Sequence, residues 1–278
     1  MFNPFLNRFH ILKLFVIVTF DFIKINVYRP LYLGFIADNI YQMKRNIFGQ
    51  KSGISVIVPV YDEIDLIRGS LVKLDSFMKR HFSNYEILVI ESGSTDGTAE
   101  VVDQIAEKSG KIKVIHQKRR CGFGSALKMG YRKAAKTFIW TVTVDFPFPL
   151  NSILDVFSLT NKYDVILSYR ASDPRGLVRR LQSYVFNGLS KKVLALPFKQ
   201  INSAFKIFRT SAIKNIHFYS DDWLIEAEIL YHVNKLHLKY IEIPVPLIDR
   251  TLGKSKITFL TSFKMFRNLF LLRMQLDG

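Results

Sequence analysis

The sequence predicts an α/β fold with a mostly parallel sheet flanked by helices, and two observations carry this prediction. Short apolar runs alternate with amphipathic segments from residue 54 onward, a pattern typical of β-α-β units with right-handed crossovers. Hydrophobic residues make up 49% of the 278-residue chain, which is enough for a sizeable core. In such sheets ligands bind beyond the carboxyl ends of the strands, so we expect the chemistry at that edge.

The first half of the fold is expected to contain four strands and three helices in alternation. Buried-type apolar runs predict strands at 54–59, 85–90, 113–116 and 138–144. Apolar residues at helical spacing predict helices at 66–80, 98–108 and 125–135. Strands and helices that follow one another at this spacing require crossover connections, which place neighbouring strands parallel.

Composition and charge narrow the class of partner. Lys and Arg total 40 against 23 Asp and Glu, which gives a net charge of +17, yet the chain also holds 24 Phe and 12 Tyr. The aromatic content excludes a disordered basic tail, and the single cysteine, Cys121, excludes a disulfide framework. A chain both basic and apolar is expected to meet polyanions and lipid. Nucleic acid is not an expected partner, because no nucleic-acid-binding module is recognisable.

Two terminal segments are expected to associate with a membrane surface. The N-terminal segment 1–50 contains an apolar run between Lys13 and Asp21 that is too short to span a bilayer. The C-terminal segment 257–278 has a phenylalanine stripe interrupted by Lys and Arg, which is typical of a helix in a membrane interface. Packing on the domain is the alternative for both segments. A central domain at 51–256 lies between them.

Polar side chains follow each predicted strand. Asp62 and Glu63 follow the first strand, and Glu91 opens a Gly/Ser-rich turn after the second. A basic, glycine-spaced run at 118–126 follows the third strand, and Asp145 follows the fourth. Cations and exposed amides at the start of a helix suit phosphate, whereas carboxylates suit hydrogen bonding to a base or a ribose.

These motifs, in this order, resemble glycosyltransferase family 2, the inverting nucleotide-sugar enzymes with the GT-A fold. The resemblance covers about 52–256 and is carried by VPVYDE at 58–63, ESGSTDGT at 91–98 and GFGSA at 122–126. The second half is similar to polyprenyl-phosphate sugar synthases of the dolichyl-phosphate mannose or glucose type. That similarity is carried by Arg179, Arg180, Ser183 and Asn187, by SAFKIFR at 203–209 and by DRTLGKSK at 249–256.

The resemblance implies a set of site residues. The implied nucleotide-binding residues are Pro59, Tyr61, Glu63, Glu91, Gly93, Arg119, Gly122 and Gly124. The implied catalytic residues are Asp145, Arg179, Glu228, Arg250 and Lys256. Of Glu226 and Glu228, which lie two apart on a helix and cannot share a face, one is expected to be solvated and Glu228 to be functional.

The resemblance also implies a divalent cation, Mg²⁺ or Mn²⁺, bound by Asp145 with Thr143. The family has acidic residues at both positions, so Thr143-Val144-Asp145 offers one carboxylate where two are usual. A threonine hydroxyl is a poor ligand beside a carboxylate, and we therefore expect a weakened metal affinity. A second departure is Glu91-Ser92 in place of two aspartates in the nucleotide site.

The implied enzyme is membrane-associated at the cytoplasmic face and transfers mannose or glucose, with inversion, from a GDP- or UDP-linked donor to a polyprenyl or dolichyl phosphate. A phosphate acceptor is already ionised at neutral pH, so it needs no general base. If the acceptor were a glycan hydroxyl, Asp221 or Asp222 would be the base candidates. The other alternative is a non-catalytic GT-A domain that binds nucleotide or lipid phosphate. The oligomeric state is left open.

Overall fold

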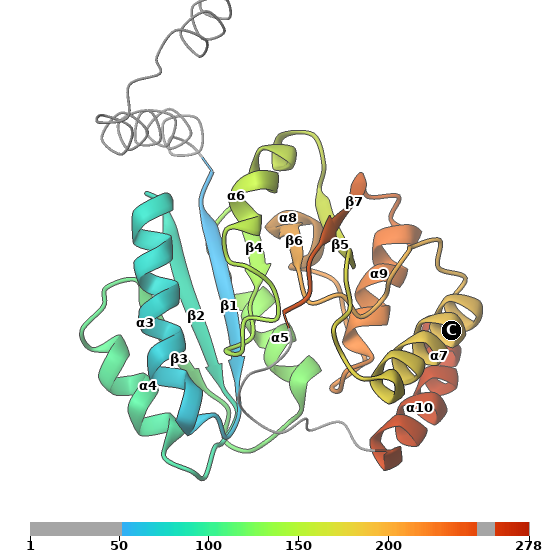
Figure 1. Ribbon diagram of the computed structural model, residues 1–278, viewed down its shortest axis with the longest axis horizontal. Helices are drawn as coiled ribbons and strands as arrows, with labels where there is room; N and C mark the ends of the chain where they lie inside the picture. Colours follow the sequence, from blue (N-terminus) through green and yellow to red (C-terminus); the bar gives the residue numbers. More distant parts are fainter. Residues whose placement is uncertain (1–51, 249–258, 278) are drawn as a thin grey trace, which may run out of the picture. The chain divides into compact units, whose positions relative to one another are not determined.

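The structure is a computed structural model that describes residues 52–248 and 259–277. Figure 1 shows a central sheet with helices on both faces. The predicted membrane segment at 1–50 lies outside the described residues, as do Arg250 and Lys256. The predicted domain bounds therefore stay a prediction.

Within the described residues the sheet has seven strands in the order β3-β2-β1-β4-β6-β5-β7. Only β6 runs antiparallel to its neighbours, β4 and β5, and the other pairs are parallel. The predicted mostly parallel α/β sheet is confirmed. The strands are β1 (Ile54–Val60), β2 (Tyr85–Glu91), β3 (Ile112–His116), β4 (Phe138–Thr141), β5 (Val165–Arg170), β6 (Lys206–Arg209) and β7 (Tyr240–Val245).

Eight α-helices are described, and the three predicted ones begin and end within two residues of their expected bounds. Helix α10 covers most of the predicted C-terminal helix. A short 3₁₀ helix (Phe157–Asn161) follows α6. The helices are α3 (Ile64–His81), α4 (Thr98–Ala106), α5 (Phe123–Lys133), α6 (Ser152–Val156), α7 (Leu177–Leu194), α8 (Thr210–Ile213), α9 (Ile225–Lys235) and α10 (Phe259–Asp277).

The sheet has an apolar core on each face, because side chains alternate between the faces along a strand. Ile57 and Leu88 belong to the core that includes residues of α5, α9 and α10. Val56, Ile87 and Trp140 belong to the core that includes residues of α3 and α6. Strands covered on both faces read as continuous apolar runs, which is why the sequence predicts them so closely.

Helix α10 packs on the domain through one side. Leu269, Leu272 and Leu276 are buried in the same core as α9 residues, while Phe270 and Met274 are exposed. Both alternatives for this segment therefore have support, and its membrane contact stays a prediction. None of the helices in the described residues is long and apolar enough to cross a membrane.

Candidate functional site

The carboxyl ends of β1, β2, β4 and β5 lie at one edge of the sheet, since these strands run in the same direction (Figure 1). Val60, the last residue of β1, lies opposite Glu91, the last residue of β2. The loops at this edge carry most of the described residues in the predicted nucleotide-binding and metal sets. The topology thus brings these predicted residues to one edge of the sheet, where ligands of parallel sheets bind.

The loops after β1 and β2 are bonded to each other. The Asp62 N–H donates to Ser94 Oγ at 3.0 Å, and the Thr95 N–H donates to Asp62 Oδ1 at 2.9 Å. The Glu63 N–H donates to Thr98 Oγ1 at 3.0 Å. Asp62 has a φ of 48°, a conformation that costs energy outside glycine, and these bonds hold it there. The two predicted nucleotide loops therefore form one rigid unit.

Glu91 is buried within this unit and acts as an acceptor at both oxygens. Its Oε1 accepts from the Ser94 N–H at 2.6 Å, and its Oε2 lies 3.0 Å from His116 Nδ1. His116 Nε2 lies 3.0 Å from Asp103 Oδ1. Burial alone would raise the pKa of Glu91, but the bonds from Ser94 and His116 outweigh it and lower the pKa. The hydrogen bond to Glu91 is the main cause that raises the pKa of His116.

His116 is a site-edge residue that the predicted site set leaves out. It ends β3, and it pairs in register with Glu91. The signal that could have identified it is its position: it is the last residue of a predicted strand, beside the end of another. The Glu91–His116–Asp103 chain ties β2, β3 and α4 together behind the nucleotide loops.

The basic loop after β3 lies against the first two loops. A Cβ on Gly93 would lie 2.9 Å from Arg119 Cα, so this glycine permits the close approach of the two backbones. The Arg120 guanidinium stacks over the Tyr61 ring at 4.3 Å. Tyr61, Gly93 and Arg119, all predicted nucleotide-binding residues, are thus brought together with Arg120.

The start of α5 differs from the expected phosphate cradle. The Gly124 and Ser125 N–H groups donate to the Asp221 carbonyl at 2.9 and 3.3 Å. A Cβ on Gly122 would lie 2.2 Å from that same oxygen, and one on Gly124 would lie 2.7 Å from the Asp222 carbonyl. The glycines therefore admit a loop of the protein, and the two amides expected to be exposed are occupied by it.

That loop, residues 219–223, is fastened at several points. The Tyr219 and Ser220 N–H groups donate to the two oxygens of Glu228 at 2.7 and 2.8 Å. Asp221 pairs with Lys128 at 2.6 Å, and the Trp223 ring stacks on Phe123 at 4.1 Å. Lys128 and Phe123 both belong to α5.

Glu226 and Glu228 both have protein partners, so the expectation that one is solvated is wrong. The buried Glu228 holds the 219–223 loop. Glu226 pairs with Lys206 of β6, whose side chain is 4% exposed. A buried ammonium such as that of Lys206 needs a charged partner, because burial removes the water that would otherwise solvate it. Direct contact of Glu228 with a reacting group stays a prediction.

Asp145 lies half-buried in the loop after β4. The Phe146 N–H donates to the Thr143 carbonyl at 3.1 Å, and the Ile248 N–H donates to the Pro147 carbonyl at 2.8 Å. Ser70 Oγ of α3 donates to the Val144 carbonyl at 2.5 Å. The loop is thus fixed to α3 on one side and to the segment after β7 on the other.

The donor set at Asp145 fits a magnesium-like cation held mainly by a diphosphate. No group of three or more His, Cys, Asp or Glu in the described residues could hold a metal by itself. Mg²⁺ is commonly bound by one or two carboxylates together with substrate phosphates and water. One carboxylate in a fixed loop at this edge matches that pattern, with Thr143 at most an additional oxygen.

Arg170, which ends β5, is a further site-edge residue that the predicted set leaves out. It donates to Ser183 Oγ at 2.9 Å and to the Asn202 carbonyl at 3.1 Å. Asn187 donates to Asn202 Oδ1 at 2.9 Å. Burial is the first cause that lowers the pKa of Arg170, to about 10, so it is still charged at neutral pH. The Ser183 and Asn187 motif thus joins α7 to the strand-end edge, and Arg179 is exposed on the same helix.

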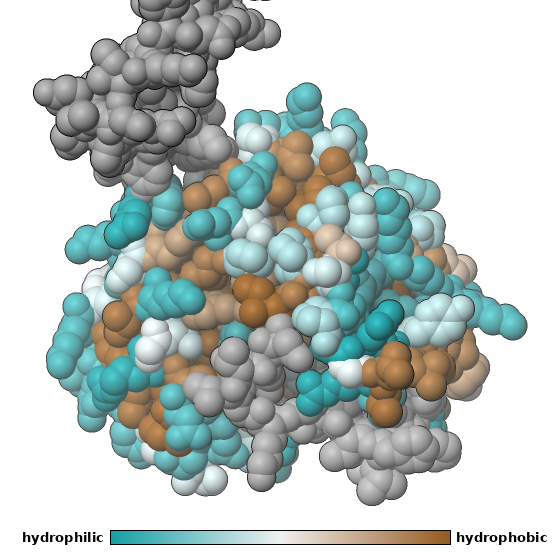
Figure 2. All heavy atoms as spheres, in the orientation of Figure 1, coloured by the Kyte–Doolittle hydropathy of each residue, from teal (hydrophilic) through white to brown (hydrophobic). Residues whose placement is uncertain are grey.

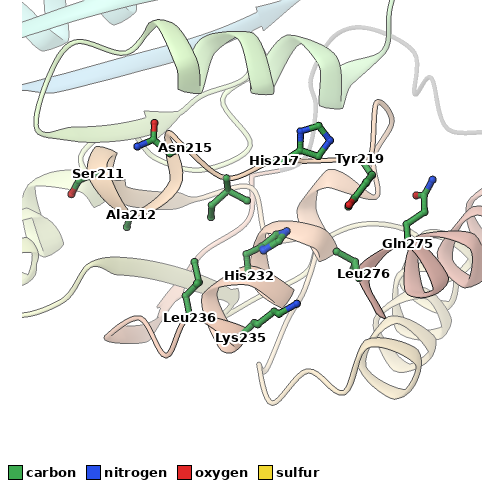
Figure 3. A pocket seen from close by; sticks show the side chains of 11 residues that line it. Ser211, Ala212, Asn215, His217, Tyr219, His232, Lys235, Leu236, Gln275 and Leu276 are labelled. Atoms are coloured by element: carbon green, nitrogen blue, oxygen red, sulfur yellow. The ribbon is translucent and has the colours of Figure 1, made fainter. Parts of the chain in front are cut away.

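A cavity of about 570 Å³ lies elsewhere, among residues of α8, α9 and α10 and the 215–219 segment (Figure 3). His232 and Lys235 line it from α9. Helix α8 follows Arg209, which pairs with the first residue of β4, so the α8 end of the cavity lies toward the amino end of that strand, while Tyr219 at its other side belongs to the loop that packs on α5. The cavity contains no predicted site residue.

A mixed, mostly parallel sheet with acidic, basic and glycine-rich loops at one edge defines a glycosyltransferase domain of the GT-A fold. The chain belongs to glycosyltransferase family 2: the sequence profile described as "Glycosyl transferase family 2" matches residues 55–231. The predicted family is confirmed.

Curated relatives are similar over most of this chain. An undecaprenyl-phosphate 4-deoxy-4-formamido-L-arabinose transferase of Edwardsiella ictaluri is 28% identical over 210 residues, which cover 73% of this chain and 62% of that protein. The enzyme of the same name from Klebsiella pneumoniae is 26% identical, with 78% and 66% covered. The chain thus spans less than two thirds of the length of these two relatives.

Solved structures support the fold. Mannosyl-3-phosphoglycerate synthase from Rubrobacter xylanophilus has a TM-score of 0.63 at 18% identity and covers 86% of this chain and 78% of its own. Glucosyl-3-phosphoglycerate synthase from Mycobacterium tuberculosis, with Mn²⁺, uridine diphosphate and glucosyl-3-phosphoglycerate, has a TM-score of 0.60 at 18% identity, with 84% and 81% covered. The predicted GT-A fold is confirmed.

Proposed function

We propose that this protein transfers a sugar from a nucleotide-diphosphate sugar to a polyprenyl phosphate at a membrane surface, at its cytoplasmic face. The observation that carries the choice of acceptor is the state of Asp221 and Asp222. Asp221 pairs with Lys128, while Asp222 accepts from the Leu224 N–H at 2.9 Å and from Asn268 Nδ2 at 3.1 Å. Carboxylates held in this way are poorly placed to take a proton from a hydroxyl, whereas a lipid phosphate needs no base.

The nucleotide moiety would bind at the loops after β1, β2 and β3. Glu91 and Asp62 stiffen these loops through their bonds to Ser94 and Thr95. Arg119 and Arg120 are exposed beside Tyr61, and guanidinium groups bind phosphate oxygens through paired donors. The donor diphosphate would therefore lie between the arginines and Asp145.

Asp145 is the residue that would hold a divalent cation, Mg²⁺ or Mn²⁺. When bound, such a cation neutralises charge on a departing diphosphate. The protein positions Asp145 through the bonds from Ser70 and Ile248 to its loop. Arg170, Arg179, Arg250 and Lys256 are the remaining cations proposed to meet phosphate.

The sugar is a separate question from the reaction. Mannose or glucose stays the prediction, and the relatives are named for 4-deoxy-4-formamido-L-arabinose on undecaprenyl phosphate. The assay is therefore incorporation of label from a panel of GDP- and UDP-linked sugars, with a nucleotide-linked formamido-arabinose included. The acceptor is a short polyprenyl phosphate in detergent.

The matched control acceptor is the corresponding polyprenol, which lacks only the phosphate. Label on the phosphate and not on the alcohol is the expected result. An oligosaccharide is offered in a parallel reaction. Label on it, and not on the polyprenyl phosphate, would show a glycan acceptor and overturn the proposal. Nucleotide binding without transfer from any donor would indicate the non-catalytic alternative.

A further inference from the structure

The outer face of α7 exposes five large apolar side chains. They are between 45% and 79% exposed and comprise Leu177, Val178, Leu181, Tyr184 and Val185. Their spacing places them on one side of a helix. The buried residues of α7, Ser183, Phe186, Ser190 and Leu194, lie on the other side. The core therefore does not explain these five apolar positions.

Helix α10 packs beside α7 and has a similar arrangement (Figure 1). Leu269, Leu272 and Leu276 face the core, and Phe270, Leu271 and Met274 are exposed at 53%, 48% and 71%. Figure 2 shows hydrophobic surface gathered where α7 lies, next to strongly hydrophilic side chains. We call these exposed apolar side chains of α7 and α10, together with the Lys and Arg side chains of α7, the apolar-basic face.

The charge on this face indicates what covers it. Helix α7 carries Arg179, Arg180, Lys191 and Lys192 and has no acidic residue. A helix with an apolar side and Lys or Arg beside it is the arrangement that binds anionic lipid in the plane of the interface. A second copy of the chain would instead bring like charges together, which is unfavourable.

We propose that the apolar-basic face docks on an anionic bilayer, with the apolar side chains of α7 inserted among the headgroups. The sequence predicts membrane contact only for the two terminal segments, so α7 is a new contact surface. Helix α7 is joined through Ser183 to Arg170 at the strand-end edge. Docking would therefore bring the site close to lipid phosphates, a consequence that, unlike the docking, rests on the proposed function.

The test is flotation of the full-length protein with vesicles of phosphatidylcholine and phosphatidylglycerol. The triple variant Leu177→Ser, Leu181→Ser, Tyr184→Ser is expected to bind at least about tenfold more weakly, because it removes apolar area from the inserted side. Val72→Ser is the matched control, since Val72 is an apolar residue 54% exposed on α3. It should bind like the unchanged protein.

A second measurement is independent of the loss of binding. Tyr184→Trp should be quenched by brominated lipid in anionic vesicles, whereas Val72→Trp should not. Undiminished flotation of the triple variant, or no quenching at Tyr184→Trp, would overturn the proposal. A dimer that the triple variant converts to monomers, without vesicle binding, would show that a second copy covers the face.

The two proposals fail separately. Transfer to a short acceptor in detergent tests the reaction without a bilayer, and the triple variant should retain it. Vesicle binding through α7 without transfer from any donor would leave the docking intact and overturn the reaction. Transfer in detergent together with undiminished flotation of the triple variant would leave the reaction intact and overturn the docking.

Discussion

At the scale of single residues, three carboxylates near this site mainly hold backbone groups; Glu91 and Glu228 are buried and Asp96 is exposed. Glu91 accepts from Ser94, Glu228 accepts from Tyr219 and Ser220, and Asp96 accepts from the Ile64 N–H at 3.1 Å. Hydrogen bonds to a charged acceptor are stronger than neutral ones. Loops that would otherwise be mobile are therefore preorganised before any ligand binds.

The pair of Glu91 and His116 predicts a pH dependence of stability. The pKa of His116 is raised, so its contribution is complete below about 6.5 and is lost as the pH rises through the folded-state pKa. The pKa of Glu91 is lowered, so its contribution is lost only as the pH falls through that lower value. Stability from this pair is therefore greatest from about pH 4.5 to 6.5.

Urea unfolding at several pH values from 5 to 9 measures this contribution, with His116→Gln as the variant. His116 is partly exposed, so we expect a difference of only about 1 kcal/mol at pH 5.5. The difference should shrink toward pH 9. A constant difference across this range would contradict the assignment of the charge to His116.

The single carboxylate of the metal loop predicts opposite effects at two positions. Asp145→Asn is expected to lower transfer about a hundredfold, or about 2.7 kcal/mol in transition-state stabilisation. Thr143→Asp restores a second carboxylate and should lower the Mn²⁺ concentration for half-maximal activity about tenfold. Titration of Mn²⁺ into the protein with a nucleoside diphosphate present should show the same shift.

Asp155→Asn is the control for Asp145, because Asp155 is an exposed carboxylate on the nearby α6. It should leave both activity and Mn²⁺ affinity unchanged. Full activity of an Asp145→Ala variant would exclude Asp145 as the metal ligand.

At the scale of elements, the packing of the 219–223 loop on α5 requires glycine at two positions, 122 and 124. A Cβ on Gly124 would meet backbone atoms of Ser220, Asp221 and Asp222 at 2.7–2.8 Å, and backbone cannot move aside as a flexible side chain can. Gly124→Ala is therefore expected to destabilise the protein by about 1–3 kcal/mol. It should also weaken donor binding, since the loop and the start of α5 must separate.

Gly69→Ala is the matched control, because Gly69 lies inside α3 and a Cβ there would meet nothing within 4 Å. Alanine in a helix interior should stabilise by about 0.5–1 kcal/mol. Denaturant midpoints of the two variants and of the unchanged protein measure both effects. Equal midpoints for Gly124→Ala and the unchanged protein would show that the loop leaves α5 readily.

Local pattern predicts elements well and distant contacts poorly. Strands β1 and β2 follow from apolar runs covered on both faces, but β4 ends at Thr141, three residues before its expected end. The Thr143–Phe146 turn takes over there. Helix α5 was also predicted, yet its amides bond to Asp221, almost a hundred residues further along the chain. The same applies to β6, whose antiparallel register depends on partners in β4 and β5.

At the scale of the whole molecule, the chain is both strongly basic and rich in apolar residues, and the two kinds of side chain lie in different places. Most apolar side chains of the strands are in the two cores, while exposed apolar side chains gather on α7 and α10. The excess of Lys and Arg gives +17 overall. A positive protein is drawn toward an anionic membrane before any specific contact forms, and salt screens this attraction.

This attraction predicts a salt effect that depends on the form of the acceptor. With polyprenyl phosphate in vesicles containing phosphatidylglycerol, the initial rate of transfer should fall at least about threefold from 50 to 500 mM NaCl, since the Debye length shrinks over that range. With a short acceptor in neutral detergent, the protein meets no charged surface and the rate should change much less. Initial rates at subsaturating acceptor measure both, and vesicles of phosphatidylcholine alone are the control. An equal fall in all three systems would place the salt effect in the nucleotide site, where arginines meet the diphosphate, and would contradict attraction to the bilayer as its cause.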